Sequence, residues 1–383
     1  MDDLPDWLRL TLRPGVGPAA QRALLAAFGL PGQIFRASHS AVRAVVGAEI
    51  TDQILAPPQA DGIDAALRWC AEPGNHILTL ADPDYPPALL DIPDPPVLIY
   101  VKGDPAVLGQ PALAVVGARS ATPQGIANAA AFARSLADSG LAIVSGLALG
   151  IDTAAHQGAL ASASGKTVAV IGTGADRVYP ARNKALAHQV VTRGAIISEF
   201  PLGTAPLRHN FPRRNRIIAG LARGVLVVEA AVGSGSLITA RLATDCGREV
   251  FAIPGSIHSP LSRGCHRLIR EGAKLVETAE DVLEELRWGT TALPVGNTED
   301  APARATSKRA DRECEGRGSD AMQRPPPTQE GVRLLELIGY DPVDIDTLAA
   351  RSGLTLDALY AILLPLELGG HIDRMPGGRF QRL

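Results

Sequence analysis

Residues 142–152 read Ala-Ile-Val-Ser-Gly-Leu-Ala-Leu-Gly-Ile-Asp, a short apolar run that ends in a glycine-containing turn and leads into a helix-like stretch. The same order recurs along residues 76–288, where short apolar runs alternate with helix-like segments. The strand candidates are residues 97–101, 113–117, 142–146, 167–172, 195–199, 224–230 and 249–255. Because they are apolar on nearly every residue, we expect strands buried on both faces. The pattern predicts a doubly wound α/β domain with a mostly parallel sheet, whose ligands bind beyond the carboxyl ends of the strands.

The composition limits the classes of protein to which the 383-residue chain can belong. Hydrophobic residues make up 46% and charged residues 20%, which is typical of a folded globular protein. Lys and Arg total 37 against 40 Asp and Glu, so a nucleic acid would have to be held by a local basic patch. Aromatic residues make up only 4%, which weighs against a sheet that stacks several bases, as in RRM or OB domains.

Targeting and cysteine signals are weak. The chain has no run of about 18 uncharged apolar residues, so no membrane span is expected. The N-terminus reads MDDLPDWLRL and lacks the apolar core of a signal peptide, which predicts a cytoplasmic protein. The four cysteines show no paired spacing and predict neither a disulfide framework nor a zinc site; they are Cys70, Cys246, Cys265 and Cys314.

The segments on either side of residues 76–288 have different characters. Residues 1–75 show helical periodicity interrupted by Gly15-Val-Gly17, as in a helix-hairpin-helix or SAM-like domain. That turn either presents backbone N–H groups to a phosphate or makes a tight connection between two helices.

Residues 289–327 are polar and predict a flexible linker. Residues 328–383 contain three helical patterns and a closing Pro-Gly-Gly hairpin, the order of a winged helix.

Small residues follow the ends of several predicted strands and form the first part of a candidate site. Gly146, Gly174 and Gly235 stand where strands lead into helices, so a ligand could approach the backbone there. Ser145 and Ser236 lie next to two of these glycines. The nucleotide signatures G-x-G-x-x-G and G-x-x-x-x-G-K-[ST] are absent, so neither an NAD nor a P-loop ATP cofactor is expected.

A basic window supplies the second part of the candidate site. Residues 200–228 contain no acid, and Arg213, Arg214 and Arg216 follow Pro212 at a plausible helix start, with Asn215 between them. Cations in the first turn oppose the helix dipole, which costs about 0.3–1 kcal/mol each. The pattern therefore favours an anionic partner; the alternative is a solvated basic face with some salt bridges.

Catalytic signals are few. Asp152 and His156 are four residues apart, so on one helix face they could perform acid–base chemistry or form a hydrogen bond that braces the helix. Neither a G-x-S-x-G nucleophile elbow nor an H-E-x-x-H metal motif is present. His258, Cys265 and His266 are close in sequence, but without a second cysteine pair they do not indicate a metal site. The sequence predicts a binding protein that is not an enzyme and has no metal or cofactor.

Taken together, the motifs of residues 115–276 resemble those of the DNA-processing protein A (DprA/Smf) family. In chain order they are Val116–Arg119, Ser145–Asp152 with His156, Gly172–Gly174, Tyr179-Pro180 with Asn183, Ser198-Glu199, Phe211–Ile218, Glu229-Ala230, Ser234–Ala240, Pro254-Gly255, Gly264–Ile269 and Gly272-Ala273. The resemblance implies an extended Rossmann-like domain that binds single-stranded DNA without a catalysed reaction. It also implies protection of incoming strands during natural transformation, help in loading the RecA recombinase, and a homodimer.

The resemblance also assigns residues. The basic residues that bind phosphate groups in this family correspond to Arg119 and Lys184. The expected DNA-binding set is Arg119, Ser145, Gly146, Gly174, Asn183, Lys184, Arg213, Arg214, Asn215, Arg216, Gly235 and Ser236. The alternative is a nucleotide-derivative hydrolase like the lysine-decarboxylase-like phosphoribohydrolases. That class has a Pro-Gly-Gly-x-Gly-Thr-x-x-Glu element, whereas here Glu229 precedes the glycines.

The predicted C-terminal helix at residues 355–368 differs from a helix that reads DNA. It contains Asp357 and Glu367 but no Lys or Arg, whereas a recognition helix in the major groove uses Arg, Lys, Asn or Gln. We therefore expect residues 328–383 to form a protein-contact module, which either binds a partner or folds back onto the basic patch of residues 76–288 and modulates access of DNA.

Overall fold

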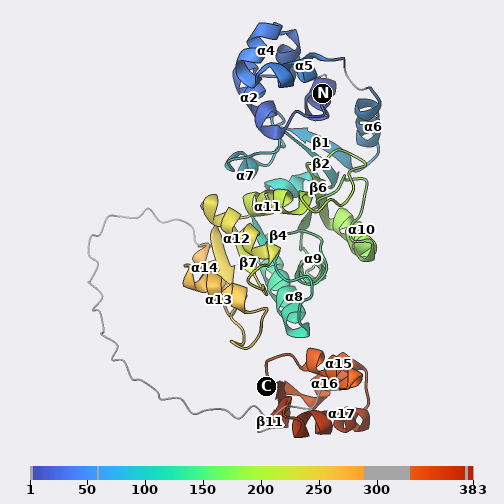
Figure 1. Cartoon of the computed structure of the whole chain (residues 1–383), viewed down its shortest axis with the longest axis vertical. Helices are drawn as coiled ribbons and strands as arrows, with labels where there is room; N and C mark the ends of the chain where they lie inside the picture. The colour runs from blue at the N-terminus through green and yellow to red at the C-terminus, as the bar shows by residue number, and fades with distance from the viewer. Residues whose placement is uncertain (1–2, 58–59, 289–327, 376–377, 383) are drawn as a thin grey trace, which may run out of the picture. The chain divides into compact units, whose positions relative to one another are not determined.

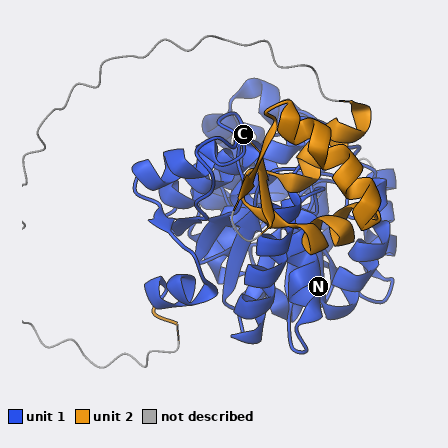
Figure 2. Ribbon diagram, turned by 90° about the horizontal axis from the view of Figure 1, so that it is seen from below, with its two compact units in different colours: residues 1–286 blue, residues 287–383 orange. Residues whose placement is uncertain are grey.

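The computed structural model describes residues 3–57, 60–288, 328–375 and 378–382 (Figure 1). The chain divides into two compact units, residues 1–286 and 287–383, which Figure 2 colours separately. The linker predicted at 289–327, with Cys314, lies outside the described residues. No single helix among the described residues is long and apolar enough to cross a membrane. Two consecutive helices, Ile345–Ser352 and Leu356–Leu368, reach the required length and composition only when they are taken together. The chain bends by 108° between them.

The first unit begins with short helices that enclose a small core of their own. They are α1 (Leu4–Thr11), α2 (Pro18–Phe28), α3 (Pro31–Arg36), α4 (His39–Val46), α5 (Ala48–Leu55) and α6 (Ala60–Cys70). Leu10, Leu24, Ile34 and Ile54 are fully buried between them. Pro occupies the first turn of α1, α2 and α3, where its missing N–H would have no partner within the helix.

A nine-stranded sheet forms the body of the first unit. Its strands are β1 (Asn75–Thr79), β2 (Leu98–Gly103), β3 (Ala112–Val116), β4 (Ala142–Ser145), β5 (Thr167–Val170), β6 (Gly194–Ser198), β7 (Gly224–Val227), β8 (Glu249–Ala252) and β9 (Lys274–Leu275). They lie in the order β1-β2-β6-β5-β4-β3-β7-β8-β9. The pairs β1·β2 and β2·β6 are antiparallel and all other pairs are parallel, so the predicted mostly parallel sheet is confirmed.

The helices cover both faces of this sheet, as in a doubly wound fold. They are α7 (Pro87–Leu90), α8 (Pro123–Asp138), α9 (Ile151–Ala161), α10 (Lys184–Arg193), α11 (Asn210–Leu221), α12 (Gly235–Asp245), α13 (Arg263–Arg270) and α14 (Ala279–Glu285). α9 packs against α8 and α10, whereas α11 packs against α7 and α12 (Figure 1). Every residue of strands β3 to β7 is buried, which explains their continuous apolar character. The strand order reverses at β3, between β4 and β7.

The second unit has the predicted order of a winged helix. Its elements are α15 (Gln329–Ile338), β10 (Val343–Asp344), α16 (Ile345–Ser352), α17 (Leu356–Leu368), β11 (Ile372–Met375) and β12 (Arg379–Arg382). The strands form a sheet in the order β10-β12-β11. Leu334, Leu348, Leu359, Leu363 and Phe380 are buried together in its core. The predicted fold class is therefore confirmed in both units.

Candidate functional site

A cavity of about 640 Å³ opens at the carboxyl ends of β3, β4 and β7, where the strand order reverses. Ligands of doubly wound proteins bind at such a point because loops from neighbouring strands diverge there. The walls come from the loops after β3, β4 and β5, the start of α9, the loop before α11, and the starts of α11 and α12. They include Gly117, Arg119, Ala148, Asp152, Tyr179, Arg208, Phe211, Arg214, Asn215, Ser234, Gly235 and Ser236. We call this the switch-point cavity.

Arg119 and two aromatic rings form one wall of the switch-point cavity. The Arg119 guanidinium lies 5.6 Å from the centroid of the Phe211 ring, and the Tyr179 and Phe211 rings lie 5.8 Å apart. Tyr179 is 46% exposed, and Arg119 and Arg208 are also exposed. Among the described residues, neither of these arginines forms an ion pair. Guanidinium groups that are not neutralised can bind phosphates, and exposed ring faces can stack on bases.

Arg214 forms the floor of the switch-point cavity and is buried. Its Nη1 donates to the carbonyl oxygen of Gly146 at 2.8 Å and to that of Val170, and its Nε donates to Asn215 Oδ1 at 2.9 Å. A Cβ on residue 146 would lie 2.3 Å from the guanidinium, which explains the glycine there. Arg214 therefore holds the loop after β4 in place instead of projecting into solvent.

The charge of Arg214 is balanced by a buried carboxyl group. Asp152 accepts a hydrogen bond from the backbone N–H of Ala148 at 3.3 Å. Burial raises the pKa of Asp152, and the nearby positive charge of Arg214 opposes that rise. Burial lowers the pKa of Arg214 to about 10, and Asp152 counteracts this shift. Each group thus favours the charged form of the other.

Arg213 and Arg216 do not reach the switch-point cavity. Both pair with Glu199, which follows β6; Arg213 Nε lies 3.2 Å from Glu199 Oε1, and Arg216 also pairs with Asp94 at 3.0 Å. The Glu199 side chain is only 3% exposed, so burial raises its pKa, opposed first by Arg216 and then by Arg213. The positive charges of Arg213 and Arg216 are therefore neutralised by acids outside residues 200–228. For these two residues the structure agrees with the salt-bridge alternative.

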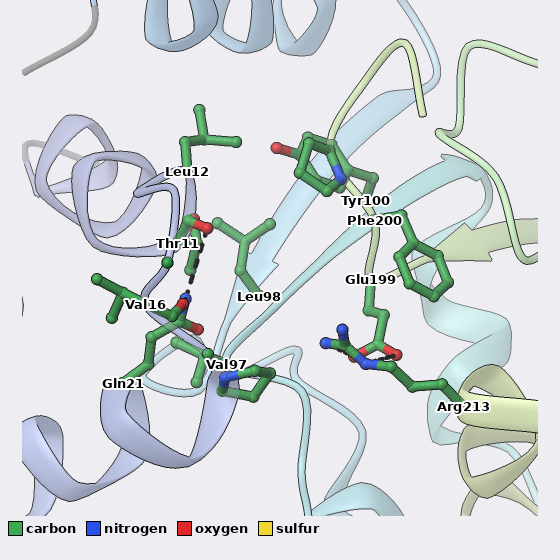
Figure 3. A pocket seen from close by; sticks show the side chains of 14 residues that line it. Thr11, Leu12, Val16, Gln21, Val97, Leu98, Tyr100, Glu199, Phe200 and Arg213 are labelled. Carbon is green, nitrogen blue, oxygen red and sulfur yellow. Dashed lines mark hydrogen bonds and ion pairs between the residues drawn. The ribbon is translucent and has the colours of Figure 1, made fainter. Parts of the chain in front are cut away.

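A second, smaller cavity of about 340 Å³ lies on the Glu199 side of α11 (Figure 3). Residues 15–18 and Gln21 line one side, and Leu98, Tyr100 and Glu199 line the other. Arg213 faces Glu199 there (Figure 3). The Gly15-Val-Gly17 turn therefore borders a cavity beside an ion pair. Its phosphate and connector interpretations both stay predictions.

Several predicted site residues form hydrogen bonds that hold the loops of the site in place. Ser145 Oγ donates to the carbonyl oxygen of Val115 at 2.6 Å, and Ser145 is fully buried. Asn183 Nδ2 donates to the carbonyl oxygen of Leu147 at 2.9 Å. The Gly174 N–H donates to the carbonyl oxygen of Thr204 at 3.1 Å. These contacts fix the shape of the loops after β4 and β5.

The start of α12 brings further predicted residues to the switch-point cavity. Ser234 caps this helix by accepting a hydrogen bond from the N–H of Ser236, and Asn215 Nδ2 donates to the carbonyl oxygen of Gly235 at 3.3 Å. The structure therefore brings together Arg119, Arg214, Asn215, Gly235 and Ser236. Lys184 is exposed at the start of α10 and does not line the cavity.

The expected DNA-binding set left out Arg208, Tyr179 and Phe211, although Arg208 lies in the acid-free window and the two aromatic residues stand in the family motifs. The low aromatic content concealed a local pairing, because the two rings are distant in sequence and meet only in the fold. One signal was available: each ring directly precedes a proline after a predicted strand, Tyr179 in a loop and Phe211 in the first turn of α11. A ring placed this way is held near the ligand-binding edge of the sheet.

The two catalytic candidates do not pair with each other. His156 is fully buried, and its Nδ1 lies 2.7 Å from Thr167 Oγ1 of β5. The bracing hydrogen bond thus joins α9 to β5 and does not involve Asp152. Among the described residues, no group of three or more His, Cys, Asp or Glu side chains could hold a metal ion.

We expect His156 to make stability depend on pH. Burial lowers its pKa to about 3 from 6.5, so between these values the unfolded chain binds one more proton than the folded one. The free energy of unfolding should therefore rise with pH in this range, by up to about 1.4 kcal/mol per pH unit from this group. Urea denaturation from pH 4 to 7 should show a smaller rise for His156→Gln. Equal slopes for the two proteins would contradict this assignment.

The doubly wound sheet with its basic, aromatic switch point, together with the winged helix, defines an extended Rossmann-like class of protein. The family model described as DNA recombination-mediator protein A matches residues 76–287, and the DprA winged helix domain matches residues 319–378. The chain therefore belongs to the DNA-processing protein A (DprA/Smf) family.

Individual relatives agree with this assignment. Protein Smf of Escherichia coli is 42% identical over 317 residues, which are 82% of this chain and 80% of the relative. DprA of Streptococcus pneumoniae is 51% identical over 210 residues, covering 55% of this chain and 74% of the relative.

Two solved structures are also similar. The X-ray structure of S. pneumoniae DprA has a TM-score of 0.66 and 39% identity, covering 73% of this chain and 97% of that one. A Helicobacter pylori DprA structure, whose subject is its single-stranded DNA binding mode, has a TM-score of 0.50 and 30% identity. It covers 55% of this chain and 95% of that one.

Proposed function

We propose that this protein binds single-stranded DNA in the switch-point cavity. The observation that carries the proposal is the wall formed by Arg119, Phe211 and Tyr179, where an exposed guanidinium lies over the Phe211 ring and this ring packs beside Tyr179. Phosphates would contact Arg119 and Arg208 and the backbone N–H groups at the start of α12, while a base would stack on an exposed ring. Backbone groups and ring faces do not distinguish one base from another by hydrogen bonds to the base edges. The protein should therefore show little preference for particular DNA sequences.

The biological role that we propose follows from membership of the family. The protein would protect incoming single strands during natural transformation and assist loading of the RecA recombinase, acting as a homodimer in the cytoplasm. The relationship to S. pneumoniae DprA and the single-stranded DNA binding described for the H. pylori protein support this role.

The hydrolase alternative receives no support from Glu229, the carboxylate that precedes the glycines. Glu229 accepts hydrogen bonds from the Thr122 backbone N–H at 2.9 Å and from Thr122 Oγ1 at 2.5 Å. This carboxylate is thereby tied to the start of α8. We therefore propose a binding protein without a catalysed reaction, and an assay for base release from nucleoside monophosphates would test that statement.

Titration of fluorescently labelled oligonucleotides at several salt concentrations tests the proposed function. We expect single strands to bind more tightly than duplexes of the same sequence. Affinity should fall with salt, with a log–log slope of about −0.7 for each phosphate neutralised on a single strand. Equal or tighter binding of duplexes, or affinity that does not change with salt, would contradict the proposal.

A further inference from the structure

The outer face of α17 carries an uninterrupted apolar stripe. Its members stand at four-residue intervals and are exposed by 48%, 45%, 59% and 81% respectively: Leu356, Tyr360, Leu364 and Leu368. The inner face of the same helix is apolar as well, because Leu359, Leu363 and Leu366 are buried in the core of the second unit. A surface helix of a small folded unit normally has a polar outer face. Four large apolar residues in a row on that face indicate an interaction surface.

The charges around this stripe are acidic. Asp357 is exposed on α17 and Glu367 is partly exposed near its end, whereas the helix contains no Lys or Arg. Over residues 328–382 there are eight acids and five arginines. Two of those arginines lie against aromatic rings: Arg374 is 5.9 Å from the Phe380 centroid and Arg382 is 5.0 Å from the Tyr340 centroid. A phosphate backbone would be repelled by α17, and the helix offers no side chain suited to reading base edges.

We propose that the outer face of α17 binds an amphipathic helix of a partner protein, with its apolar side on the stripe and Lys or Arg on its flanks. Apolar side chains at i, i+4 and i+8 are a common way to seat one helix on another. Basic flanks of the partner would meet Asp357 and Glu367, so charge would select the partner as well as its apolar face.

A second copy of the same helix fits less well. Pairing two copies antiparallel would bring Asp357 of one near Glu367 of the other, and parallel pairing would bring each acid near its own equivalent. Like charges that face each other across an interface are unfavourable, so self-association through this face lacks charge complementarity. An anionic membrane surface would be repelled for the same reason.

The test uses the full-length protein and two synthetic helical peptides with the same leucine face. One peptide carries lysines beside that face and the other carries glutamates at the same positions. In fluorescence anisotropy titrations we expect the lysine peptide to bind at least tenfold more tightly than the glutamate peptide. Leu364→Ser should weaken the lysine peptide at least tenfold. Leu90→Ser is the matched control, because Leu90 is 53% exposed on α7 of the other unit and should leave binding unchanged.

Two further measurements complete the test. Thermal denaturation should show the same midpoint for Leu364→Ser and wild type, since Leu364 is exposed, and their affinities for single-stranded DNA should be equal. A failure of this proposal is therefore distinguishable from a failure of the proposed DNA binding. Equal binding of the two peptides, or no effect of Leu364→Ser, would overturn it. Sedimentation velocity that showed an oligomer dissociated by Leu364→Ser would also overturn it, because a second copy would then occupy the face.

Discussion

Replacing Arg119 with alanine is expected to weaken the binding of single-stranded oligonucleotides by at least about tenfold at moderate salt, about 1.4 kcal/mol. The Arg119 guanidinium is exposed, lines the switch-point cavity and lies beside the Phe211 ring. The substitution would remove a charge-assisted hydrogen bond to a phosphate, worth about 1.5–3 kcal/mol. Because phosphates carry no sequence information, all oligonucleotide sequences should be affected alike.

The salt dependence separates this effect from a general loss of folded protein. Arg119→Ala should flatten the log–log slope by about 0.7, since one fewer phosphate is neutralised. Lys184→Ala should act in the same direction, although Lys184 lies outside the cavity. The matched control is Arg134→Ala, because Arg134 is an exposed arginine far along α8 that pairs with Asp138. Wild-type affinity and slope in Arg119→Ala would show that this residue does not contact DNA.

Much of the fold could be predicted from the apolar runs, because buried parallel strands are hydrophobic on both faces. All seven predicted strands correspond to β2 through β8. The sequence did not reveal β1 or β9. β1 includes Asn75, His76 and Thr79 and lies at the antiparallel edge, and β9 has only two residues. Edge strands lack the continuous apolar signal that marks the middle of the sheet.

The site was harder to predict because its arginines pair with acids that are distant in the sequence. Arg213, Arg214 and Arg216 are neighbours in sequence, yet Arg214 points to the switch-point cavity and the other two point to Glu199. One of the balancing acids, Asp94, is more than a hundred residues away in sequence. The helix dipole argument assumed that the helix starts at Pro212, but α11 begins at Asn210, so Arg214 and Arg216 lie beyond its first turn. Acids outside the window balance all three arginines: Glu199 and Asp94 for Arg213 and Arg216, and Asp152 for Arg214. Local spacing alone cannot show such pairing.

The buried position of Arg214 leads to a large expected effect on stability. Arg214→Met should lower the free energy of unfolding by about 3–5 kcal/mol, because it leaves Asp152 as a buried carboxylate without its counter-charge. The carbonyl oxygens of Gly146 and Val170 would also lose a donor. Urea denaturation measures the loss. Arg213→Met is the matched control and should cost about 1 kcal/mol or less, because Arg213 is exposed and Arg216 still pairs with Glu199.

The pH dependence of Arg214→Met identifies Asp152 as the cause of the loss. Asp152 already has a pKa above its ordinary value of 3.8 because it is buried, and removal of the arginine should raise this pKa further. A carboxyl group whose pKa is higher in the folded state binds more protons there, so stability falls as pH rises from about 4 through the folded pKa. The variant should therefore be closest to wild type in stability at low pH. Adding Asp152→Asn should remove this pH dependence and recover part of the lost stability. If the loss were the same at every pH and Asp152→Asn recovered none of it, the Arg214–Asp152 charge balance would not support the floor of the cavity.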